Sequence, residues 1–151
     1  MNRFQGKLEI RQAKKSDLNG IKSLLESVSL PSADIDNHIS NFLLLECDGN
    51  IAGTVGMEMY GETALLRSLA IQKEFQKKGY GRKLCNKLLS DAGIFNVKNV
   101  YLLTETAKDF FSREGFQIIS REAVPEEIKR TYEYTTLCPS DSTCMVKKIN
   151  E

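Results

Sequence analysis

Three apolar, strand-like segments follow one another with only tight turns between them, and this run constrains the fold more than any other feature. The segments are 41–47, 51–60 and 64–71. Asp48-Gly49-Asn50 is a strong hairpin signal between the first two, and Gly61 marks the next turn. The sequence therefore predicts an antiparallel meander of three strands.

Helical and strand-like spacing alternate on both sides of this meander. Before it, 8–11 reads as a strand, Ser16 is a good helix N-cap, and apolar residues keep to one helical face over 18–28. A second short helix is expected over 32–39. After the meander we expect a helix containing Leu84 to Ala92 with Gly93 at its C-cap, a strand over 100–103, a helix over 107–113 ended by Gly115, a strand over 116–121, a helical turn over 125–131 and a closing strand over 144–149.

This order of elements predicts one α/β (α+β) domain over residues 1–151. Its centre is a mixed, mainly antiparallel sheet of six to seven strands, with helices on both faces. A length of 151 residues and a hydrophobic content of 41% suit one soluble domain with a sizeable core. No apolar run is long enough to cross a bilayer and no signal peptide is evident, so we expect a cytoplasmic protein.

Charge and ligand chemistry exclude several function classes. A formal net charge of +1 gives no general attraction to nucleic acid or to a membrane, so we expect neither partner. Four scattered cysteines form no C-x-x-C pair, and the chain has one histidine. We therefore expect no disulfide framework and no metal.

The chemistry is concentrated where the third strand, 65–71, runs through a loop with two glycines, 76–82, into a helix. Glycine lets the backbone approach a ligand, and a helix N-terminus offers unpaired N–H groups and a positive dipole end. This geometry binds a phosphate or pyrophosphate. Basic residues add local positive charge: Lys73, Lys77, Lys78, Arg82 and Lys83.

Two familiar phosphate-binding motifs do not fit this loop. The P-loop pattern G-x-x-x-x-G-K-[ST] is absent, and Leu84 stands where a dinucleotide fingerprint needs its third glycine. The spacing of Gln76, Gly79 and Gly81 instead resembles the Q/R-x-x-G-x-G/A coenzyme A signature of the GNAT acetyltransferases. The alternative interpretation is a basic surface loop with two turn glycines.

A second segment, 107–116, resembles the A-x-x-F-Y-x-K-x-G-F helix that flanks the thiol end of coenzyme A in this family. Phe111 stands where the family often has a tyrosine that protonates the leaving thiolate. Together the resemblances span 8–149. They imply a transferase that uses acetyl-CoA as cosubstrate, without a metal and without a covalent enzyme intermediate.

The resemblance also implies which residues hold the cosubstrate. The strand over 65–71 would diverge from 100–103, with pantetheine in the gap, and backbone N–H groups of 69–71 would bind the thioester carbonyl. The expected cofactor-binding residues are Leu69, Ala70, Ile71, Gln76, Lys77, Lys78, Gly79, Tyr80, Gly81, Arg82 and Phe111.

Two charged residues on the meander are the catalytic candidates. The attacking amine must be neutral, and Glu58 is the expected base, with Glu62 second. The alternative for Glu58 is an exposed strand carboxylate. Arg67 lies within an apolar strand, which suggests either a clamp for a substrate carboxylate or a salt bridge to Glu58 or Glu62.

Four stretches resemble the branch of the family found with arsenic-resistance genes, the arsinothricin and phosphinothricin-type N-acetyltransferases, and resemble N-acetylglutamate synthase-like proteins less closely. They are 57–61, 64–70, 101–104 and 137–145. The implied acceptor is a small amino-acid-like amine. A protein N-terminal acetyltransferase and a coenzyme A-binding module with weak or no turnover remain alternatives, and a homodimer remains open.

Two cysteines in the last of these stretches have more than one interpretation. Cys138 and Cys144 could bind a trivalent arsenical, form a disulfide, or pack as small side chains.

Overall fold

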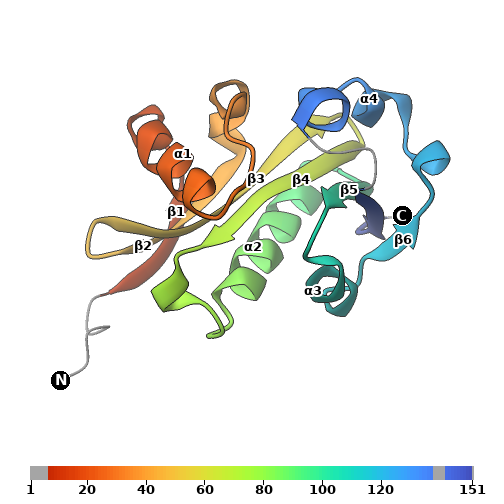
Figure 1. The fold of residues 1–151 in the computed structure, drawn as a ribbon. Coiled ribbons are helices and arrows are strands. Elements are labelled where there is room, and N and C mark those ends of the chain that lie inside the picture. Colours follow the sequence, from red (N-terminus) through yellow and green to blue (C-terminus); the bar gives the residue numbers. More distant parts are fainter. Residues whose placement is uncertain (1–6, 138–141, 151) are drawn as a thin grey trace. The chain divides into compact units, whose positions relative to one another are not determined.

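The computed structural model describes residues 7–137 and 142–150, shown in Figure 1. Its strands form one mixed sheet in the order β1-β2-β3-β4-β5-β7-β6. The strands are β1 (Leu8–Gln12), β2 (Phe42–Cys47), β3 (Asn50–Tyr60), β4 (Thr63–Ile71), β5 (Asn99–Thr104), β6 (Gln117–Ile119) and β7 (Thr143–Lys148), and the α-helices are α1 (Leu18–Ser27), α2 (Tyr80–Ile94), α3 (Lys108–Arg113) and α4 (Glu126–Lys129). The β4–β5 pair is parallel, whereas β1–β2, β2–β3, β5–β7 and β6–β7 are antiparallel. The predicted fold class is confirmed, and the three strands of the predicted meander, β2, β3 and β4, are neighbours in that order.

The chain packs as two compact units. The first comprises residues up to 57 together with 68–88, and the second comprises 58–67 and the residues from 89 onward. The prediction of a single domain over 1–151 stays a prediction. No helix in the described part of the chain is long and apolar enough to span a membrane.

The first unit is built on antiparallel pairing. Leu8 of β1 lies opposite Cys47 of β2, and β2 pairs with β3 from Phe42 opposite Gly56 onward. Gly56 is required here because a side chain at this position would overlap the ring of Phe42. A hydrophobic core cluster lies in this unit; its fully buried members include Ile21, Leu25, Ile35, Phe42 and Leu44.

In the second unit β5 lies between β4 and β7. The parallel pairing of β4 with β5 joins only 63–65 to 99–101. Beyond it β5 stays paired with β7 as far as Thr104, but the described residues 66–67 of β4 have no partner on 102–103. The two strands therefore stop pairing within the stretch where divergence is expected.

Four predicted elements differ from the structure. Helix α2 continues through Gly93 to Ile94, and its stop signal is Asn96, which has a left-handed φ of 67°. The Asn96 N–H donates to Gly93 O and the Val97 N–H to Ala92 O, which is a Schellman motif with asparagine in the usual glycine position. Asparagine tolerates this conformation because its short polar side chain can hydrogen-bond locally.

The other three differences involve short 3-10 turns. Ser16 lies inside a 3-10 turn, Lys15–Asp17, and α1 begins only after it. The predicted strand over 116–121 is paired only as β6, after which the chain turns at Arg121–Ala123. The expected helix over 32–39 is a 3-10 helix, Ile35–Asn41.

Candidate active site

The loop after β4 is anchored at both ends by backbone and apolar contacts. The Gln72 N–H donates to Ala52 O at 2.8 Å, and its side-chain Nε2 donates to Ile51 O at 2.7 Å. After the 3-10 turn Lys73–Phe75, the buried ring of Phe75 meets the ring of Tyr80 edge-on at 6.5 Å. These contacts therefore fix both ends of the loop over residues 76–79, at the end of β4 and at the start of α2.

Gly79 has the backbone conformation that the loop needs. Its φ is +87°, and nothing lies within 4 Å of the position a Cβ would occupy, so the conformation and not crowding selects glycine. Its carbonyl accepts a hydrogen bond from the Lys83 N–H at 3.2 Å, which starts α2. The N–H groups of the first helical turn are then available to a ligand.

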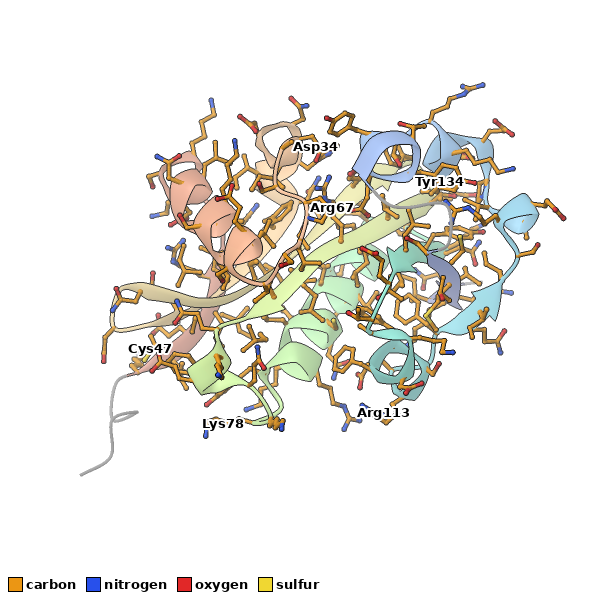
Figure 2. All side chains as sticks on the ribbon, in the orientation of Figure 1. Asp34, Cys47, Arg67, Lys78, Arg113 and Tyr134 are labelled. Atoms are coloured by element: carbon orange, nitrogen blue, oxygen red, sulfur yellow. The ribbon has the colours of Figure 1, made fainter. Side chains whose placement is uncertain are left out.

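The five basic side chains predicted to give this loop its charge are all exposed, and Figure 2 shows Lys78 on the loop before α2. Lys83 Nζ lies 5.5 Å from the ring centroid of Tyr80. The side chain of Gln76 contacts the protein backbone: its Nε2 donates to Ile71 O at 2.8 Å, which connects the loop to the end of β4. Gly81 and Arg82 lie in the first turn of α2.

Strand β4 changes conformation just before the residues expected to bind the thioester. Ser68 has a φ of +61°, an unusual value for a non-glycine residue inside a strand. A left-handed residue interrupts the pleat, as in a β-bulge. Leu69 and Ile71, which follow, are half-buried, and Ala70 is buried.

The two catalytic candidates meet in a buried ion pair of the second unit. Arg67 Nη1 lies 2.7 Å from Glu58 Oε2, and the side chains are 0% and 1% exposed. The Tyr60 hydroxyl donates to Glu58 Oε1. Arg67 Nε lies 3.5 Å from Oε1 of Glu133, which is also buried. Figure 2 labels Arg67 within the structure.

This geometry decides between some of the open interpretations. Glu58 is not an exposed strand carboxylate, since both of its oxygens are engaged in the interior. The salt bridge of Arg67 to Glu58 is present, whereas the exposed Glu62 lies 3.3 Å from Lys98 Nζ. A substrate-clamping role for Arg67 and a base role for Glu58 stay predictions.

Sequence reasoning missed two members of this cluster. Tyr60 could have been found, because residues two apart on a strand share a face and Tyr60 follows Glu58 at that spacing. Glu133 gave no signal, since it lies far along the chain in a π-helical turn, Glu133–Leu137.

Phe111 is part of a packed aromatic cluster. It is buried, and its ring centroid lies 5.1 Å from that of Phe110 and 5.7 Å from that of Phe116, both edge-on.

Cys144 is also buried, and burial raises the pKa of its thiol, an effect that the positive charge of Arg121 opposes. Cys138 lies outside the described residues.

Comparison with known proteins identifies the class of this chain as an acyltransferase and gives its family. Residues 38–118 match the family described as "Acetyltransferase (GNAT) domain". An uncharacterized N-acetyltransferase of Chlorobaculum tepidum is 31% identical over 89% of this chain and 90% of its own length. The chain therefore belongs to the GNAT acetyltransferases.

Two further relatives carry amino-acid activities in their names. The amino-acid acetyltransferase of Neisseria meningitidis is 28% identical over 83% of this chain, which spans 31% of that protein. The solved N-acetylglutamate synthase of Neisseria gonorrhoeae, complexed with coenzyme A and N-acetyl-glutamate, has a TM-score of 0.83 at 26% identity. It is matched by 97% of this chain, which spans 36% of that protein.

Proposed function

We propose that this chain transfers the acetyl group of acetyl-CoA to the α-amine of a small acidic amino acid, either glutamate or an analogue such as arsinothricin or phosphinothricin. The observation that carries the proposal is the buried Arg67–Glu58 pair, because Arg67 stands on the strand whose next residues are expected to bind the thioester. The amino-acid acetyltransferase relatives support the same acceptor class.

The loop after β4 would hold the phosphates of the cosubstrate. Backbone N–H groups from Gly79 into the first turn of α2 would donate to the phosphate oxygens, and the exposed lysines and Arg82 would balance their charge. Gln76 would act indirectly, by fixing the loop against Ile71.

The reaction would be a direct attack of the amine on the thioester carbonyl. N–H groups of residues 69–71 would stabilise the developing oxyanion, at about 3–4 kcal/mol per donor. Glu58 would take the ammonium proton, directly or through a water. Because Phe111 cannot donate a proton and thiols have a pKa of about 8.5, coenzyme A would leave as the thiolate or be protonated by solvent.

Arg67 would bind the α-carboxylate of the acceptor through its guanidinium, while Glu58 and Glu133 fix the orientation of that group. A cation for the carboxylate and a base for the ammonium would thus lie on one rigid pair of strands.

The test combines an acceptor screen with a matched pair of glycine variants. Thiol release from acetyl-CoA is followed with free amino acids, with glutamate analogues and with peptides. Gly79→Val should abolish binding of acetyl-CoA, whereas Gly49→Val should not, although Gly49 has a similar φ of +82° and equally open surroundings. Acetyl-CoA at one hundred times its Kd should stabilise the native protein by about 2.7 kcal/mol.

Each failure has a distinct meaning. No shift of Tm at saturating acetyl-CoA would refute the cosubstrate assignment. Turnover on peptide N-termini but not on amino acids would replace the proposal with a protein N-terminal acetyltransferase. Binding without turnover on any acceptor would leave a coenzyme A-binding module.

A further inference from the structure

Arg121, in the turn after β6, is a half-buried arginine whose contacts with the described residues are made to neutral groups. Its Nη1 donates to the backbone carbonyl of Ser142 at 2.9 Å, and its guanidinium lies over the ring of Tyr134, 4.9 Å from the centroid. Across residues 7–137 and 142–150, no carboxylate lies within ion-pair distance of it. The guanidinium is therefore fixed in place by neutral groups.

Ser142 supplies a second, independent observation at the same place. The residue is 5% exposed, and its Oγ has no hydrogen-bond partner among the described residues. A buried hydroxyl without a partner destabilises a fold unless something else uses it. The residue that accepts a hydrogen bond from Arg121 thus also holds a hydroxyl without a partner, and no carboxylate of the described residues pairs with this arginine.

A chain of contacts links this pair to the buried ion cluster within the same unit. Tyr134, which lies under Arg121, directly follows Glu133, which contacts Arg67. Tyr60, which donates to Glu58, packs against the same apolar cluster as Tyr134. Figure 2 labels Tyr134 and Arg67. Arg67 and Arg121 therefore contact two adjacent residues of one short turn, Glu133 and Tyr134.

We propose that Arg121 and the Ser142 hydroxyl form an anion subsite for the distal acidic group of the acceptor. This deepens the proposed function and rests on it: Arg67 takes the α-carboxylate, and Arg121 with Ser142 takes the second acid. The ligand chemistry is a carboxylate or phosphinate with two accepting oxygens, one for a guanidinium N–H and one for the hydroxyl.

A purely structural role for Arg121 predicts different behaviour. In that case the Nη1 bond and the ring contact only fix the start of β7, and the Ser142 hydroxyl has no role. Ser142→Ala separates the two roles, because it keeps the carbonyl that Arg121 contacts and removes only the hydroxyl. Removing an unsatisfied buried hydroxyl should leave Tm unchanged or higher in either case.

The experiment compares L-glutamate with L-glutamine, which has the same shape without the second charge. Arg121→Met should raise the KM for L-glutamate by about ten- to hundred-fold, and Ser142→Ala by roughly three- to ten-fold, the range of charge-assisted hydrogen bonds. The KM for L-glutamine should change by less than about two-fold. Arg130→Met, which removes an exposed arginine of the same unit, should change neither KM.

Equal changes for both amino acids, or an unchanged KM for L-glutamate in Ser142→Ala, would overturn the subsite while the proposed function stands. If the wild-type protein acetylates neither amino acid, the subsite is judged by calorimetric titration of glutarate into the coenzyme A-bound protein, and the proposed function is refuted only if the glutamate analogues are not acetylated either. Binding of glutarate that is lost in Arg121→Met supports the subsite, and no binding by the wild type overturns it.

Discussion

Two arginines of this protein each contact two carboxylates, yet they lie in different environments. Arg11 on β1 binds both oxygens of Asp17 at 2.9 Å and Glu46 through Nε at 2.9 Å. The side chains of that cluster are 28%, 13% and 24% exposed. The contacts of Arg67 include a close one to Glu58 at 2.7 Å and a longer one to Glu133 at 3.5 Å, with side chains that are 0%, 1% and 6% exposed.

We therefore expect the Arg11 cluster to stabilise the fold, whereas burial of the Arg67 cluster costs free energy that other interactions must offset. The Arg11 cluster has complete bidentate geometry at little desolvation cost, and it ties β1 to β2 and to the turn before α1. The Arg67 cluster bears a large desolvation penalty, and an apolar replacement of the whole cluster could be as stable. We expect the Arg67 cluster to contribute little net stability, which agrees with the role in binding and catalysis proposed above.

The largest expected effect is on removal of the buried guanidinium. Arg67→Met should lower the free energy of unfolding by about 3–5 kcal/mol, because it leaves buried carboxylates without their cation. The same substitution at Arg11 should cost about 1 kcal/mol. Urea unfolding of both variants measures the two losses of unfolding free energy. Equal losses would contradict the proposed difference between the two clusters.

A smaller effect is expected at the long contact. Glu133→Gln keeps the shape of the side chain but weakens its bond to Arg67 Nε, and should cost about 1.5 kcal/mol. If Glu133 orients the guanidinium for substrate, the KM for the amino acid should rise while that for acetyl-CoA stays constant. Steady-state kinetics with each substrate varied decide this, and an equal rise in both KM values would make Glu133 only structural.

The smallest effect concerns pH and the half-exposed cluster. The Arg11 guanidinium lowers the pKa of Asp17 below its ordinary value near 3.9. Because the folded-state pKa is depressed, the stabilisation is complete above the unfolded value and is lost as the pH falls through the folded value. Asp17→Asn should therefore cost about 1 kcal/mol at pH 7 and almost nothing near pH 2. A cost that does not change over this range would contradict the assignment.

The sequence predicted the regular elements well because their signals are local. The turn glycines, the alternation of strands and the helical face of α1 and α2 each depend on residues close together in the chain. The exceptions are ends of elements. Gly93 looked like a cap, but the following residues continue the helix until Asn96 adopts the left-handed conformation. Gly93 and Asn96 both tolerate a left-handed conformation, and only the structure shows that Asn96 is the residue that ends α2.

The site was predicted where a motif is continuous and was incomplete where it is assembled from distant segments. Residues 76–82 are continuous in the chain, a loop followed by the first turn of α2, so one motif covers them all. The partners of Arg67 come from β3 and from the turn at Glu133, and no periodicity connects these positions. The left-handed Ser68 was also unpredictable, since serine rarely adopts that conformation.

The exposed basic loop has a consequence for rates of encounter. Five basic residues and Glu74 give residues 73–83 a net charge of +4, so the remaining residues together carry −3 of the total of +1. A multiply charged anion approaching in solution is thus attracted to one loop and repelled by the average of the rest. The attraction extends over a Debye length of about 8 Å at physiological ionic strength. Although the protein is nearly neutral overall, this local charge should raise the rate at which anionic ligands collide with the loop.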